Sequence, residues 1–155
     1  MRVTRYTDYA LRVLIYLAVI PDRLSTIQEI AEHYHISKNH LMKVVQQLNS
    51  MGYVKATRGK NGGLTLGQPA AQINLGQVVR ITERSETSAL VECFSEENHC
   101  VITPNCQLRY ILAEALQQFM LTPDRSPLAD IVTPEQRPAL ISLRQLSRDC
   151  PNHAP

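Results

Sequence analysis

The first third of the chain carries short apolar stripes at helical spacing. Over residues 4–20 apolar side chains recur every three or four positions, as on one face of an amphipathic helix. The same spacing predicts helices over residues 27–35 and 38–50. Ser37 stands at the expected N-cap of the second of these helices. Two helices joined by so short a turn indicate a helix-turn-helix.

A β-hairpin is expected next. Residues 53–57 and 64–66 read as two short strands, and the segment 58–63 between them contains an Asn-Gly pair, which favours a tight turn. A hairpin directly after a helix-turn-helix is the wing of a winged helix. Its tip carries Arg58 and Lys60 among glycines, a composition suited to phosphate or minor-groove contact.

The second half alternates helices with an irregular segment. Asn74 is placed to cap a helix over residues 75–83, and residues 84–103 then lose all periodicity; a loop of this length in a compact domain usually has a function. A long helix should begin at residues 103–104 and run to about residue 121, with a wide apolar stripe that packs on its own core or on a partner helix. A weaker helix is expected over residues 133–146.

Composition places the chain among ordinary globular proteins. It has 155 residues, 44% hydrophobic and 19% charged, which excludes a disordered or fibrous chain. Its longest apolar run, residues 13–20, is far shorter than the ~20 residues that cross a bilayer. We therefore expect a cytoplasmic protein with no membrane partner. In that compartment thiols stay reduced, so its four cysteines point to metal or redox chemistry.

The charge is distributed unevenly. Residues 1–82 hold ten Lys and Arg against four Asp and Glu, a net +6, whereas residues 83–155 hold six against ten, a net −4. A basic module suggests a polyanionic partner such as nucleic acid. Amide and cationic side chains on the second helix suit base edges or phosphates, although any solvated helix face is polar. The candidate DNA-binding residues are Ser37, Lys38, Asn39, His40, Lys43, Gln46, Arg58 and Lys60.

Three cysteines gather in the irregular segment. Cys93, Cys100 and Cys106 lie within fourteen residues, and clustered thiolates select zinc, copper(I) or iron-sulfur clusters. Their spacing is wider than the two-residue knuckle of zinc ribbons and suits a larger inorganic core. A fourth ligand is needed, either His99 or a carboxylate from elsewhere in a dimer. A metal-free loop is the plain alternative, and Cys150 is expected to take no part.

Three function classes remain at this point. A zinc-stabilised DNA-binding protein and a thiol-redox regulator with reversibly paired cysteines compete with an iron-sulfur regulator. An enzyme is not expected, because no Ser/His/Asp order, phosphate loop or paired-carboxylate pocket can be assembled from the sequence.

Three separated motifs carry a family resemblance. They are Thr-Arg-Tyr-Thr-Asp-Tyr-Ala-Leu-Arg at residues 4–12, Arg-Gly-Lys-Asn-Gly-Gly at 58–63, and the cysteine segments at 90–93 and 100–108. Together they resemble the NsrR family of nitric-oxide-sensing repressors, in the winged-helix repressor family that also includes the iron-sulfur regulator IscR. The likeness runs from residue 1 to about 132. It implies a homodimer with one iron-sulfur cluster per subunit near the dimer interface, which binds promoter DNA and releases it when nitric oxide attacks the cluster.

The resemblance also suggests a ligand set. In IscR the fourth ligand is a histidine three residues after the last cysteine, but Arg109 stands there in this chain, which argues against an IscR-type site. In NsrR-type proteins an aspartate of the other subunit's first helix can complete a 4Fe-4S cluster, and Asp8 occupies that position. The ordinary role of such a carboxylate in the first turn would be a favourable interaction with the helix dipole. The implied metal ligands are Cys93, Cys100, Cys106 and Asp8, with 4Fe-4S favoured over 2Fe-2S.

We therefore expect a mainly α fold with a small β-hairpin wing: a winged helix-turn-helix plus a long dimerisation helix. The expected domains are a winged helix-turn-helix DNA-binding domain (residues 1–82), a cluster-binding loop (83–103), a dimerisation helix with a C-terminal helical segment (104–146) and a flexible tail (147–155). The expected function is a homodimeric, nitric-oxide-sensing transcriptional repressor. The alternative is a zinc- or thiol-based DNA-binding regulator without an iron-sulfur cluster.

Overall fold

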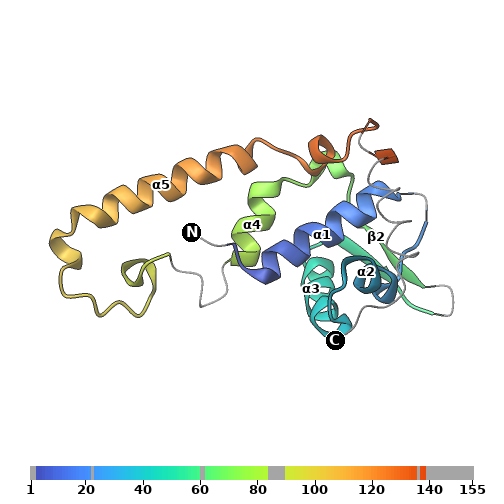
Figure 1. Cartoon of the computed structure of the whole chain (residues 1–155), viewed down its shortest axis with the longest axis horizontal. Coiled ribbons are helices and arrows are strands. Elements are labelled where there is room, and N and C mark those ends of the chain that lie inside the picture. Colours follow the sequence, from blue (N-terminus) through green and yellow to red (C-terminus); the bar gives the residue numbers. More distant parts are fainter. Residues whose placement is uncertain (1–2, 22, 60–61, 84–89, 136, 139–155) are drawn as a thin grey trace.

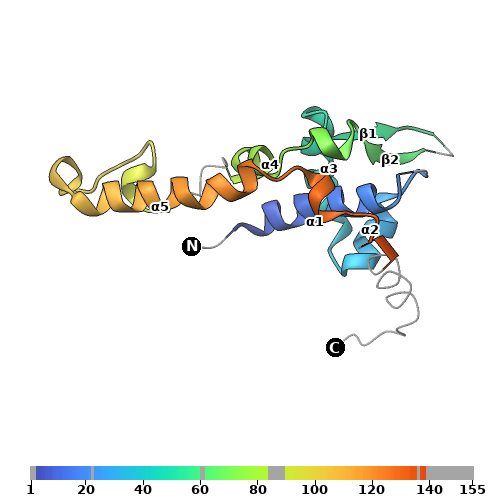
Figure 2. The same ribbon diagram turned by 90° about the horizontal axis from the view of Figure 1, so that it is seen from above.

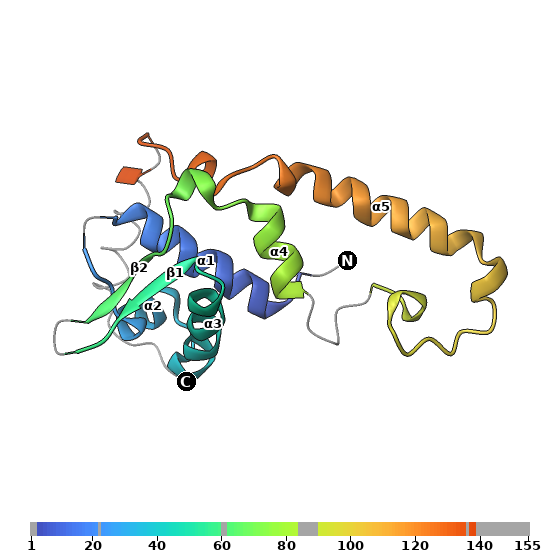
Figure 3. The ribbon, with the colours of Figure 1, turned by 180° about the vertical axis from the view of Figure 1, so that it is seen from behind.

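The protein consists of a winged-helix body and one long helix that extends from it as an arm (Figure 1). The computed structural model describes residues 3–21, 23–59, 62–83, 90–135 and 137–138. Helix α1 lies in the middle of the body, with α3 and the hairpin on one side and the arm on the other (Figures 1 and 3).

The first three helices follow the predicted pattern closely. Helix α1 spans Arg5–Val19, α2 spans Ile27–Tyr34 and α3 spans Lys38–Ser50. At the start of α1 the Thr4 hydroxyl accepts the backbone N–H of Thr7 at 3.2 Å, which satisfies a donor that the helix itself leaves unpaired.

Helix α2 starts and stops through local interactions of the same kind. The Thr26 hydroxyl accepts the N–H of Glu29 at 3.1 Å. The helix ends at His35, which takes a left-handed conformation with φ of 53°, a common way to close a helix. Ser37 does occupy the N-cap position of α3, but its side chain makes no capping hydrogen bond there.

The wing is a two-stranded antiparallel hairpin. Strand β1 (Val54–Thr57) pairs with β2 (Gly63–Leu66), with Val54 opposite Leu66. The hairpin is fixed to the body because Ser25 and Leu64 exchange two backbone hydrogen bonds of 3.1 and 2.8 Å. Just after β2 the chain passes close to the turn that follows α3. A Cβ on Gly67 would lie 2.2 Å from the Gly52 carbonyl oxygen in that turn.

The hydrophobic core lies around α1. Val13, Leu14 and Leu17 are at most 1% exposed, and burying each such side chain stabilises the fold by about 1.5–3 kcal/mol. Helix α4 (Leu75–Glu83) packs against α1. Its predicted N-cap is confirmed, because the Asn74 side chain accepts the N–H of Gln77 at 2.9 Å.

The predicted limits of the long helix were wrong at both ends. Residues Thr103–Asn105 form a separate 3-10 turn, and α5 spans Gln107–Asp124. The interruption is at Cys106, whose extended backbone (φ −85°, ψ 105°) breaks the helical path. Beyond α5 the chain returns to the body, where Leu128 is fully buried and donates its N–H to the Ile73 carbonyl at 2.8 Å.

Parts of the sequence prediction lie beyond the described residues. The expected helix over 133–146 lies there for the most part, and the expected tail over 147–155 does so entirely. The domain limits stay predictions. Among the described helices, none has the length and apolar character that a membrane span requires.

Candidate nucleic-acid interface and cysteine loop

Helix α3 divides sharply into a buried and an exposed face. Leu41, Val44, Val45 and Leu48 are at most 4% exposed. The opposite face holds the predicted contact residues. All six predicted residues at the N-cap or within α3 are exposed: Ser37, Lys38, Asn39, His40, Lys43 and Gln46. All the α3 candidates are therefore accessible, with Asn39, Lys43 and Gln46 in the middle of the outward face.

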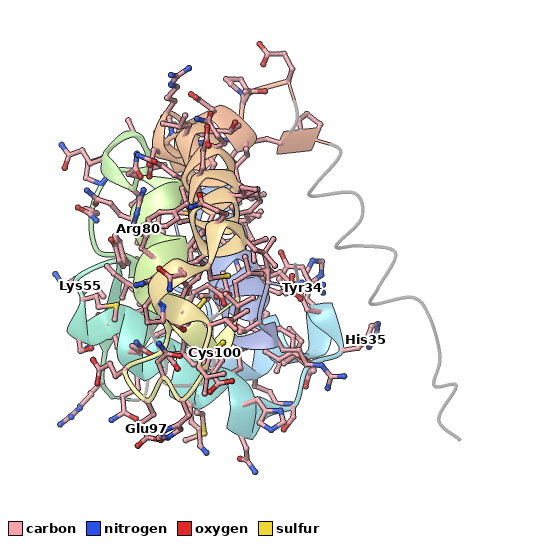
Figure 4. The ribbon with its side chains drawn as sticks, turned by 90° about the vertical axis from the view of Figure 1, so that its left-hand side faces the viewer. Tyr34, His35, Lys55, Arg80, Glu97 and Cys100 are labelled. Carbon is pink, nitrogen blue, oxygen red and sulfur yellow. The ribbon has the colours of Figure 1, made fainter. Side chains whose placement is uncertain are left out.

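The hairpin supplies a second cationic surface next to α3. Arg58 is exposed, while Lys60 lies outside the described residues. Lys55, which was not among the predicted contacts, is exposed on β1 (Figure 4). Its place beside the buried Val54 in a predicted strand was the signal that could have found it. The Asn49 side chain accepts the Ala56 N–H at 3.0 Å and ties α3 to β1.

Helix α3 is also tied to α1. The hydroxyl of Tyr6 donates a hydrogen bond to the side-chain oxygen of Gln47. Burial raises the pKa of Tyr6, so the hydroxyl keeps its proton at neutral pH and remains a donor. Tyr6 belongs to the same helical turn as Asp8, which links the first turn of α1 directly to the candidate DNA-reading helix.

The three candidate metal-binding cysteines lie on the loop before α5. Cys93, Cys100 and Cys106 are all free thiols and all partly buried. Figure 2 shows this loop beside the start of α5, at the end of the arm farthest from the wing. Figure 4 looks at the loop end-on, with Cys100 near the centre of the view and Glu97 at its edge.

Hydrogen bonds close the loop on itself. The Glu92 carboxylate accepts the N–H of His99 at 3.0 Å, which joins the neighbours of Cys93 and Cys100. The Asn98 side-chain oxygen accepts the N–H of Cys100 at 3.1 Å. These bonds bring two of the cysteine-bearing stretches side by side, as a shared ligand would require.

A complete metal site is not assembled within the described part of one chain. No group of three or more His, Cys, Asp and Glu side chains there is arranged to hold a metal ion. His99 is exposed, and Arg109 stands on α5 at the position where IscR-type sites would need a histidine. The donor chemistry still fits an iron-sulfur cluster, because three free, partly shielded thiols on one loop are the ligands such clusters use.

Asp8 lies on α1 and has a partner of its own. Its carboxylate accepts from Arg12 Nε at 2.9 Å, and Arg12 Nη2 lies 2.9 Å from its second oxygen. The Arg12 guanidinium also lies 5.7 Å from the centre of the Tyr34 ring. Both side chains of the pair are more than 40% exposed, and such surface pairs contribute at most about 1 kcal/mol. Asp8 can thus be released from Arg12 at little cost.

The first turn of α1 is also held to the end of α4. The Glu83 carboxylate accepts the backbone N–H of Thr4 at 2.8 Å and its hydroxyl at 2.9 Å. It accepts the Thr7 hydroxyl as well, and that hydroxyl, which is fully buried, bonds Thr82 at 2.8 Å. Glu83 is the last described residue before the segment that leads to the cysteine loop. It therefore ties the end of α4 to the turn of α1 that carries Asp8.

The apolar stripe of α5 is exposed rather than packed on its own core. Of the eighteen helix residues, all described, Met120 is the one that is buried. The large apolar side chains at 36% exposure or more are Leu108, Tyr110, Ile111, Leu116, Phe119 and Leu121. Of the two packing alternatives that the sequence left open, packing on the chain's own core is wrong.

Three comparisons place the chain among known proteins. The Rrf2 family model, described as an iron-dependent transcriptional regulator, matches residues 3–134. A transcriptional regulator named NsrR from Bacillus subtilis is 50% identical over 134 residues, covering 85% of this chain and 90% of the relative. Its namesake from Bacillus licheniformis is 48% identical over 134 residues, covering 85% and 92%. These relatives are named as regulators, not enzymes.

Solved structures agree on the fold. CymR, the global cysteine regulator of B. subtilis, matches with a TM-score of 0.62 at 23% identity, covering 85% of this chain and 96% of that one. IscR of T. potens matches with a TM-score of 0.67 at 19% identity, covering 85% and 86%. The winged-helix prediction is thereby confirmed. Together with the family match over most of the chain, these findings show that the protein belongs to the Rrf2 family of transcriptional regulators.

Proposed function

We propose that this protein is a cytoplasmic, homodimeric transcriptional repressor that senses nitric oxide through an iron-sulfur cluster. It binds promoter DNA through α3 and the wing, and damage to the cluster releases the DNA. The observation that carries the proposal is the set of three free cysteines on one loop, presented at the start of a helix whose apolar face is uncovered.

The DNA-binding part of the proposal rests on α3 and the hairpin. The exposed amides and cations of α3 suit base edges in the major groove, and Lys55 and Arg58 on the hairpin suit phosphates. The net charge of +6 over residues 1–82 favours a polyanionic partner. The name NsrR and the helix-turn-helix description of the relatives support the same assignment.

The second copy is expected on α5. Six large apolar side chains of this helix are exposed in the single chain, and a soluble monomer rarely leaves so much contiguous apolar surface uncovered. The same helix of a second subunit would cover this face by burying its own. Two winged helices would then be held at a set distance, as adjacent major grooves about 34 Å apart require.

The cluster ligands would be Cys93, Cys100, Cys106 and Asp8 of the partner subunit. The thiols fit by chemistry, and the partner's Asp8 supplies the fourth donor that the described part of one chain does not bring to them. When bound, the cluster would supply iron that reacts with nitric oxide. We favour 4Fe-4S over 2Fe-2S because the NsrR-named relatives are the more similar ones in sequence.

The residues of the chain offer a route from that site to the DNA. Binding of Asp8 would remove it from Arg12 and hold the first turn of α1 in place. Tyr6 in that turn is hydrogen-bonded to Gln47 on α3, so a shift of the turn would move the DNA-reading helix. A coupling of about 2–3 kcal/mol would change DNA affinity about 30- to 150-fold.

The test is an absorbance spectrum of protein purified without oxygen, with iron, sulfide and zinc analysis. Gel-shift assays on promoter DNA follow, before and after addition of nitric oxide. We expect brown, iron-containing protein that loses its DNA on exposure. Cys100→Ser should be colourless, while Cys150→Ser, outside the loop, serves as the matched control. Colourless zinc protein, or DNA binding that nitric oxide leaves unchanged, would contradict the proposal.

A further inference from the structure

The exposed face of α3 carries one apolar side chain among its polar ones. Met42 is 48% exposed, whereas the four apolar residues on the opposite face are at most 4% exposed. Within the described parts of α2, α3 and the hairpin, it is the large hydrophobic side chain that is mostly free of the core, whereas Ile27, Tyr34 and Leu66 are partly buried against it. Its exposed neighbours, three or four positions away on the helix surface, are Lys38, Asn39 and Gln46. Met42 therefore contributes little to the core of this chain.

Helical geometry places Met42 on the side of α3 that faces the wing. Residues seven apart lie on one row of a helix, so Met42 shares its row with Asn49. Asn49 is the residue whose side chain accepts the Ala56 N–H of β1 at 3.0 Å. The row from Met42 to Asn49 thus runs along the edge of α3 nearest the hairpin.

The opposite edge of α3 is occupied by the body. Gln47 is held there by Tyr6 of α1. Between the two edges lie Asn39, Lys43 and Gln46, which form the middle of the outward face. Met42 consequently stands beside this middle row, between the polar side chains of α3 and the cationic hairpin.

On the basis of the proposed DNA-binding function, we propose that Met42 is a specificity-determining residue that contacts the C5 methyl group of a thymine in the major groove. The thymine methyl is the apolar feature of the major-groove base edges, and apolar side chains are what recognise it. A methionine thioether has no proton to donate to a phosphate or a base acceptor. Its unbranched chain adapts to an irregular apolar surface.

The experiment uses the full-length dimer, in the state that binds DNA, and duplexes selected from a random DNA pool. Each thymine of the selected consensus is replaced singly by deoxyuridine, which removes the methyl group and leaves every hydrogen-bonding atom. Kd values are measured by fluorescence anisotropy for the wild type, for Met42→Ala and for Lys43→Ala. Met42 is exposed, so its truncation should leave folding intact, and circular dichroism checks this.

We expect one thymine per half-site at which uracil weakens wild-type binding about fourfold, the effect of losing one buried methyl-sized group, about 0.8 kcal/mol. Met42→Ala should bind the thymine and uracil duplexes equally. Lys43→Ala should bind more weakly overall and keep the fourfold difference.

Two outcomes would overturn the inference. If no thymine is sensitive in the wild type, or if Met42→Ala keeps the same sensitivity, Met42 does not read a thymine methyl. A protein that selects no sequence at all would instead contradict DNA binding itself, and the role of Met42 with it. The selection step therefore separates a failure of the proposed function from a failure of this inference alone.

Discussion

Replacing Gly76 by alanine tests how closely α4 and the end of α5 are joined. A Cβ at this position would lie 2.0 Å from Asp124 Oδ1, 2.8 Å from the Asp124 backbone nitrogen and 2.9 Å from its Cα. All three distances fall below 3.0 Å, which real Cβ contacts essentially never do. Because two of these atoms are backbone, a rotation of the Asp124 side chain cannot relieve the contact, and the helices must move apart.

Two opposing effects decide the size of the change. Alanine is a better helix former than glycine by about 0.5–1 kcal/mol, whereas overpacking a close contact costs about 1–3 kcal/mol. Separation of the helices also strains the bonds that meet at Asp124, whose carbonyl accepts the Asn74 amide at 2.6 Å and whose carboxylate pairs with Arg80. We expect Gly76→Ala to lower the free energy of unfolding by about 1–2 kcal/mol.

Urea unfolding followed by circular dichroism measures this change. With a slope of about 2 kcal/mol per molar urea, the midpoint should fall by about 0.5–1 M at a fixed protein concentration. Gln77→Ala, at the exposed neighbouring position, is the matched control and should leave the midpoint nearly unchanged. Asp124→Ala combined with Gly76→Ala should not restore stability, since the backbone contacts remain. A Gly76→Ala protein as stable as the wild type would refute the reasoning.

Four further predictions concern single side chains. Cys100→Ser should lose the cluster but keep its helical circular dichroism, because the core lies around α1; unfolding would mean that the metal is structural. Asp8→Ala should retain iron but lose it faster in air, and an unaltered rate of bleaching would end its role as a ligand. Lys43→Ala should weaken binding to all DNA sequences and reduce the slope of log Kd against log salt concentration by about one, the effect of losing one phosphate contact. A loss of affinity for one sequence alone would indicate a base contact instead. Thr26→Ala should lower the free energy of unfolding by about 1 kcal/mol, because the N-cap of α2 is lost. Ser25→Ala should leave stability unchanged or raise it, because the buried Ser25 hydroxyl has no hydrogen-bond partner among the described residues. Thermal unfolding measures both, and equal losses in the two variants would contradict this pair of predictions.

The elements of the winged helix followed from the sequence because their causes are local. The limits of α3 agree with the expected residues 38–50. Apolar spacing, caps and turn residues act over a few positions, so one sequence suffices to place them. The exposed positions of α3 could be named for the same reason. The three cysteines could be grouped because they are close along the chain.

Tertiary structure alone decided which distant groups meet. The spacing of residues along the sequence does not predict the hydrogen bond between Tyr6 and Gln47. Nor does it predict the bonds of Glu83 to Thr4 and Thr7, or the close approach of Asp124 to Gly76. The exposure of α5 was undecided as well, because an apolar stripe looks the same whether its own body or another chain covers it. Contacts between residues dozens of positions apart depend on how whole elements pack, and that packing is a property of the folded chain rather than of any local pattern.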